Sequence, residues 1–204
     1  MNSSLNYINI KFLLFIFILS SSQVLNAQVH LNLGGGFSLP LKPAVFIEEW
    51  KTGLNFGFGI GFNLSEKSLI EIRLNYIKYD YNSEVSPYGY EIKGAEILKL
   101  IPSLNYKLYP FTFDAVINQF FQIGTGYVLT TQNDAELTSF NTKYIVVGQN
   151  KTAMLLNFGL GIDVYLFKGC KLFLIGTYEF AYTNLSDMKS IQFLSAQSGI
   201  NIFF

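Results

Sequence analysis

Charge, cysteine and long apolar runs are all scarce in this chain of 204 residues. Only 14% of the residues are charged, whereas a soluble globular domain carries about a quarter. The 14 basic and 14 acidic side chains balance, and a nucleic-acid binder with a broad basic footprint is therefore excluded. A single cysteine excludes a disulfide framework and a cysteine-rich zinc site. We expect no metal, cofactor or nucleic-acid partner.

What the chain has instead is apolar and aromatic side chains together with glycine. Half of the residues are hydrophobic, 17% are aromatic, and there are 17 glycines. Such a mixture favours strands in contact with lipid over a soluble core.

The first 27 residues are predicted to be a secretory signal peptide. Lys11 precedes the apolar run Phe12–Leu19, and three serines lead to a cleavage site after Ala27. The run is too short to cross about 30 Å of hydrocarbon as a helix; a retained N-terminal anchor is the alternative. Residues 28–204 would then form one outer-membrane domain without a transmembrane helix.

A period of two residues runs through this mature chain. In Leu54–Leu64 each large apolar residue alternates with glycine or asparagine, which is typical of a strand with unlike faces. Seven further segments share the pattern: 29–38, 70–76, 98–108, 121–130, 154–166, 172–183 and 194–204. Most reach about 9–11 residues, the length that a tilted strand needs to cross a bilayer. We predict an all-β fold, an eight-stranded antiparallel up-and-down transmembrane barrel with its apolar face outward.

The connections between these segments alternate between long and short. Long loops at 40–52, 82–94 and 132–150, and a modest one at 184–192, are expected outside the cell, with the short turns and both chain ends in the periplasm. Tyr144–Val147 is predicted to extend the strands beyond the membrane. Pro102 lies inside a strand and lacks an N–H, so we expect a local bulge there.

Six charged residues fall on the predicted inner face. They are Glu71, Arg73, Lys99, Lys107, Asp163 and Glu179. Opposite charges in a narrow lumen pair and hydrogen-bond, so the main prediction is a polar network that fills the barrel. A proton path, an ion path or a catalytic carboxylate pair is the functional alternative.

Isolated residues add little chemistry. His30 is expected in the lumen near the periplasmic rim, far from the place where an outer-leaflet enzyme would need a base. Cys170 follows a tight turn and is expected to be inert. Aromatic residues near the strand ends are predicted to form membrane-interface girdles: Tyr76, Tyr79, Tyr81, Tyr106, Tyr109, Phe111 and Phe113. No catalytic residue is predicted.

Three segments resemble a known family. The strand 95–109 has a central Pro102 and an aromatic end, Phe158–Tyr165 is followed by Leu172–Tyr182, and the chain closes on Gly199–Phe204. These segments resemble the PorT-like outer-membrane β-barrel family of Bacteroidota-type bacteria. The resemblance implies an eight-stranded barrel, and some members of that family belong to a protein-secretion apparatus. Within the final strand, Gly199, Ile200, Ile202 and Phe204 resemble the signal read by the barrel-assembly machinery.

The sequence thus favours a small outer-membrane barrel without an open channel. Its expected role is structural, adhesive or protein-binding, carried by the extracellular loops, because binding sites concentrate on loops held by a rigid scaffold. Its expected partners are outer-membrane lipid, the assembly machinery during biogenesis, and an extracellular or envelope protein. The alternatives are an outer-membrane enzyme acting on lipid or peptide, a component of a secretion apparatus, and a soluble lipocalin-like binder with its apolar face inward.

Overall fold

The computed structural model describes residues 29–82, 91–111, 116–139, 142–185 and 188–204. The predicted signal peptide, residues 1–27, and Phe113 lie outside these described residues. Among the described residues, none of the helices has the length and apolar character needed to cross a membrane.

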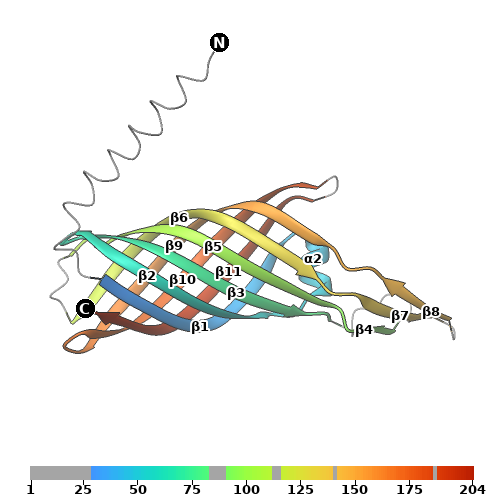
Figure 1. Cartoon of the computed structure of the whole chain (residues 1–204), viewed down its shortest axis with the longest axis horizontal. Helices are drawn as coiled ribbons and strands as arrows, with labels where there is room; N and C mark the ends of the chain where they lie inside the picture. Colours follow the sequence, from blue (N-terminus) through green and yellow to red (C-terminus); the bar gives the residue numbers. More distant parts are fainter. Residues whose placement is uncertain (1–28, 83–90, 112–115, 140–141, 186–187) are drawn as a thin grey trace, which may run out of the picture.

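Eight antiparallel strands close into a barrel (Figure 1). In chain order they are β1 (Val29–Lys42), β2 (Gly53–Ser65), β3 (Ser68–Asp80), β5 (Glu96–Leu108), β6 (Ile117–Gln132), β9 (Asn150–Phe167), β10 (Cys170–Leu185) and β11 (Met188–Phe203). Each strand pairs with the next along the chain, and β1 closes the ring against β11. The predicted fold class is confirmed, and each of the eight predicted segments lies on one of these strands.

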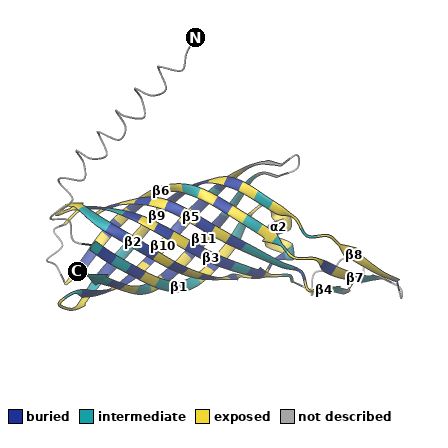
Figure 2. Ribbon diagram, in the orientation of Figure 1, coloured by how far each residue is buried: buried dark blue, intermediate teal, exposed yellow. Residues whose placement is uncertain are grey.

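Buried and exposed residues alternate along the barrel strands (Figure 2), so successive side chains lie on opposite faces of the wall. In β2 the phenylalanines Phe56 and Phe58 are exposed on the outside, whereas Asn55 is fully buried inside. The inner face is polar in the middle of the barrel, which is the reverse of a soluble sandwich. The lipocalin-like alternative, with its apolar face inward, is therefore wrong.

The strands are longer than the 9–11 residues that the sequence pattern indicated. They run from 13 residues in β2 to 18 residues in β9. The modest loop expected at 184–192 is mostly strand, because β10 and β11 remain paired as far as Leu185 and Met188. The wall therefore continues well past the span needed to cross a bilayer.

The two ends of the barrel differ. At the short-turn end, Ser65 pairs with Ser68 and a turn at Gly169 joins β9 to β10. The long-loop end carries the short helix α2 (Ala44–Glu49) and a separate sheet of β4 (Glu91–Lys93), β7 (Ala135–Ser139) and β8 (Thr142–Val146). This sheet projects beyond the barrel, away from the C-terminus (Figure 1).

The predicted bulge at Pro102 is absent. The pairing of β5 with β3 runs without a shift through Leu74 and Pro102. On the other side, the pairs of β5 with β6 stop at Leu100 and resume at Ser103 in the same register. A residue in an antiparallel ladder directs its N–H to one neighbour only. Proline therefore interrupts one ladder locally, and no extra residue has to be accommodated.

Candidate functional site

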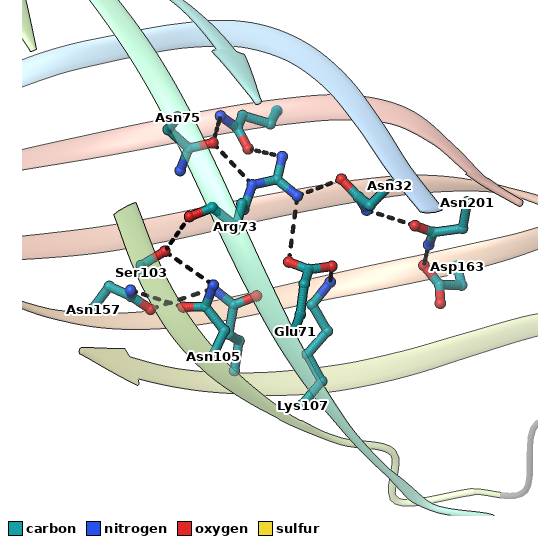
Figure 3. Close-up of polar contacts among 12 residues, drawn as sticks. Asn32, Glu71, Arg73, Asn75, Ser103, Asn105, Lys107, Asn157, Asp163 and Asn201 are labelled. Carbon is teal, nitrogen blue, oxygen red and sulfur yellow. Dashed lines mark hydrogen bonds and ion pairs between the residues drawn. The ribbon is translucent and has the colours of Figure 1, made fainter. Parts of the chain in front are cut away.

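Arg73 lies at the centre of a polar network that fills the middle of the lumen (Figure 3). Its guanidinium donates to Asn75 Oδ1 over 2.9 Å and to Gln197 Oε1 over 2.7 Å, and also to Asn32 Oδ1. Its side chain reaches across the barrel, from β3 to β1 and β11. A guanidinium has five donors in a fixed fork, so one residue can tie several strands together.

Glu71 supplies the negative charge beside this guanidinium. Its carboxylate accepts from Lys107 Nζ over 2.8 Å and from Arg73 Nη1 over 3.4 Å. All three side chains are buried. Ions removed from water need paired charges and satisfied hydrogen bonds, and these residues provide both.

Amide side chains extend the network toward other strands. Asn32 bonds to Asn201, whose amide donates to Asp163 over 3.2 Å, and Tyr109 donates to the same carboxylate over 2.9 Å. On the opposite side, Asn157 donates to Asn105 over 2.9 Å. The predicted residues Glu71, Arg73, Lys107 and Asp163 thus lie in one connected set.

Inward glycines make room for these long side chains. A Cβ on Gly57 would lie 2.5 Å from Arg73 Nη2, and one on Gly124 would lie 2.7 Å from Asn157 Nδ2. The glycines that alternate with large apolar residues in the sequence therefore leave the space that the polar side chains of the lumen occupy.

Lys99 and Glu179 lie in the lumen but in a second cluster, nearer the long-loop end. The Lys99 ammonium makes no hydrogen bond within the described residues. It lies 4.3 Å from the ring centre of Phe46, 4.4 Å from that of Phe193 and 4.9 Å from that of Tyr79. This is a cation–π cage, which differs from the ion pairing that the sequence indicated.

Glu179 belongs to a chain of hydroxyl groups beside this cage. Ser195 Oγ lies 3.0 Å from Glu179 Oε2 and 3.0 Å from Ser38 Oγ, which is 2.6 Å from the Tyr79 hydroxyl. A serine next to a carboxylate is the arrangement that the enzyme alternative requires. Here all four side chains are buried, so no substrate can reach them in this conformation.

Apolar layers close the lumen on either side of the polar centre. Toward the long-loop end, Phe46 from α2 and Trp50 join a buried cluster that includes Ile101 and Leu155. Toward the short-turn end, a second cluster contains Leu69, Phe120 and Phe173. The interior cavity between them, beside Arg73, measures about 10 Å³, roughly the space of one water molecule. The described lumen is therefore filled.

The helix α2 is held at the barrel mouth by backbone hydrogen bonds as well as by Phe46. The N–H of Asn82 donates to the carbonyl of Glu49 over 2.7 Å, and Trp50 forms a bridge with Tyr81. Partial burial, and then the neighbouring Glu48 charge, raise the pKa of the Glu49 carboxyl. The sequence predicts only a long loop at residues 40–52, and its pattern gives no indication of this plug.

Two of the tyrosines assigned to interface girdles point inward. Tyr76 and Tyr106 are exposed on the outer wall as expected, but Tyr79 and Tyr109 are buried in the lumen. Their positions have the same parity as Arg73 and Lys107 on the same strands. The alternation of inward and outward positions, continued from Arg73 and Lys107, therefore predicts that Tyr79 and Tyr109 point inward.

The two isolated candidates, His30 and Cys170, both lie at the short-turn end. His30 is buried in the lumen at the short-turn end, with its ring centre 4.1 Å from that of Phe203. Cys170 is a buried free thiol at the start of β10. In the described part of the chain, no group of three or more histidine, cysteine or acidic side chains is arranged to hold a metal ion.

The residues of the predicted assembly signal lie along β11 and just after it. A Cβ on Gly199 would overlap the Leu33 carbonyl, so the first and last strands approach closely there. Ile200 is exposed on the outer wall, Ile202 is half-buried, and Phe204 is exposed with its N–H bonded to the Val29 carbonyl over 3.0 Å.

The separate sheet at the long-loop end exposes apolar side chains. Its strands lie in the order β4, β7, β8, so β8 is an edge strand among the described residues. Tyr144 is 55% exposed, and Ile145 and Val147 are each 72% exposed. Residues 144–146 do lie on a strand beyond the barrel, as expected, but this strand does not continue a barrel strand, because residues 142–146 pair with β7 only.

Comparison with known proteins identifies the fold. No family model matches the sequence, and no curated protein matches it. The structure is similar to that of OprG from Pseudomonas aeruginosa, with a TM-score of 0.54, 14% identity, and coverage of 87% of this chain and 96% of that one. Ail of Yersinia pestis is similar with a TM-score of 0.52 and 12% identity, over 87% of this chain and 99% of that one. Neisserial surface protein A is similar with a TM-score of 0.52 and 10% identity, over 87% of this chain and 97% of that one. The chain has the fold of small bacterial outer-membrane barrels.

Proposed function

We propose that this protein is a non-catalytic outer-membrane barrel that binds another protein through the sheet of β4, β7 and β8. One observation carries the proposal: an edge strand with exposed apolar side chains projects from a barrel whose lumen is filled. Such an edge is a ready template for pairing with another strand. The long-loop end would face outward and the short-turn end the periplasm, as in other bacterial barrels.

The filled lumen supports a role at the surface over transport. Eight strands enclose only enough room for side chains, and here the interior residues leave space for about one water. The Ser195–Glu179 pair gives no support to the enzyme alternative, because both side chains are buried and inaccessible to a substrate in this conformation.

The PorT-like assignment remains a proposal that rests on the sequence. Its support is the strand 95–109 with Pro102 at its centre and the aromatic C-terminal strand. Membership in a secretion apparatus would be one form of the protein partnership proposed here. Export by residues 1–27 and recognition of Gly199–Phe204 by the assembly machinery belong to the same proposal.

Photo-crosslinking on intact cells tests the binding role. We would replace Tyr144 in β8 with benzoylphenylalanine, and Ile47 in α2 as an exposed control at the same end. We expect a discrete protein adduct from position 144 that disappears when Ile145→Lys places a charge on the edge. Adducts of equal yield from both positions, or none from 144, would contradict the proposal.

A further inference from the structure

The outer wall of the barrel carries two adjoining hollows over β6, β9 and β10. One has a volume of about 710 Å³ and the other of about 440 Å³. Phe121, Leu160 and Gly176 line both, so the two form one continuous trough. The larger part lies within the range of about 300–1,000 Å³ that is usual for ligand pockets.

Gly176 forms the floor of this trough. A Cβ placed there would meet nothing within 4 Å, which holds for no other described glycine. Its ladder partners are Leu160 on β9 and Ala196 on β11. Glycine within a strand destabilises it by about 0.5–1 kcal/mol relative to alanine. Since neither packing nor the backbone requires glycine here, the open space itself needs an explanation.

A row of residues in register borders the trough on its side toward the long-loop end. It consists of Tyr106, Ile123, Phe158, Tyr178 and Leu194, one from each of five adjacent strands. Adjacent strands lie about 4.8 Å apart, so the row is roughly 19 Å long. On the other side lie Gln119, Ile162 and Leu174. No charged side chain lines either hollow.

We propose that this trough holds one acyl chain of a membrane lipid in a fixed position. The trough lies on the wall that faces the hydrocarbon, and its volume and apolar lining suit an acyl chain. Polar groups lie at its borders, namely Gln119 and the Tyr178 hydroxyl, which bonds to Gln192 over 2.7 Å. The proposal depends on the lipid-facing wall and not on any protein partner.

The test uses the full-length mature protein in liposomes containing a phosphatidylethanolamine with a photoactivatable diazirine in one acyl chain. Labelled residues are mapped by mass spectrometry. In the wild type we expect labelling at Phe121, Leu160 and Tyr178 to exceed several-fold that at Phe58, which is exposed on β2, the strand opposite β9 in the ring. Equal labelling at Phe58 would overturn the proposal without any variant.

Variants that fill the hollow complete the test. Gly176→Leu should abolish the excess labelling, and Gly176→Ala should reduce it. The matched control is Gly35→Leu, because Gly35 also faces outward, its Cβ would make only ordinary contacts of 3.4 Å or more, and it lines neither hollow. Unchanged labelling in Gly176→Leu would refute the proposal. So would a crosslinked dimer that Gly176→Leu abolishes, since the occupant would then be a second copy.

Discussion

Two buried cations in the lumen have opposite consequences when they are removed, because only one of them is hydrogen-bonded. Arg73→Met would leave Glu71 with a single cation and leave the oxygens of Asn32 and Gln197 without their donor. Breaking a buried pair in this way costs about 3–5 kcal/mol. We expect a loss of this size in the free energy of unfolding, measured by urea titration in liposomes. Arg73→Lys, which keeps the charge, should lose less; equal losses would contradict the network.

Within the part of the chain that the structure describes, Lys99 forms no hydrogen bond that its removal would break. The double variant Lys99→Met with Glu179→Gln removes both charges of the second cluster while keeping their approximate volumes. Each buried ion carries a desolvation penalty of several kcal/mol, and the double variant removes two such penalties together with the cation–π contacts of Lys99. We expect unchanged or higher stability in the same titration. A loss of more than about 2 kcal/mol would show that the charges themselves hold the cluster.

The strand β5 is the element that proline weakens. Because Pro102 interrupts the ladder with β6 without shifting its register, Pro102→Val should add one backbone hydrogen bond. Such a bond contributes about 0.5–1.5 kcal/mol. The predicted outcome is a barrel that unfolds at higher urea concentration, with Leu104→Val on the same outward face as the control. Lower stability would mean that the backbone around residue 102 cannot accept a regular pair.

The helix α2 depends on one anchor. Phe46 fills the barrel mouth and caps the Lys99 ammonium, so Phe46→Ala should release the segment between β1 and β2. Truncating a buried phenylalanine costs about 3–5 kcal/mol, and here we expect local release, with the strands intact. Limited proteolysis should cut the variant between residues 42 and 52. The barrel itself should stay folded, which is seen in gel electrophoresis as a band whose mobility changes only after boiling. Cleavage elsewhere first would point to global unfolding.

The periodicity of the sequence specified the strands but not the elements between them. Alternation at residues such as Phe56 and Asn55 is decided within the strand, by lipid on one side and polar groups on the other. The conformation of α2 depends on contacts with distant residues, including the packing of Phe46 against Tyr79, and the separate sheet depends on the pairing of β7 with the distant β4. The lumen charges were identified by parity, whereas their division into two clusters depends on side-chain reach across the barrel.

At the scale of the whole molecule, the interior consists of an apolar layer, a polar layer and a second apolar layer. Any one of these layers is enough to block the passage of ions through the lumen. We therefore expect no ion conductance in planar bilayers. We also expect none from Phe46→Ala, because the Arg73 network and the cluster around Phe120 remain. Stable conductance steps in the wild type would show that the lumen is not filled. Steps only in the Phe46→Ala variant would show that α2 alone closes the lumen.

The pairing of β1 with β11 also governs how the barrel must form. Asn32 and Asn201 meet across this seam although they lie 169 residues apart in sequence. Contacts between residues so distant in sequence are slow to form, because the entropy of closing the loop comes before any gain from the contact. Until β11 arrives, β1 and the growing sheet present open edges and an apolar outer face. The barrel strand that is synthesised last, β11, is thus the one that ends the period of exposure to aggregation and proteolysis.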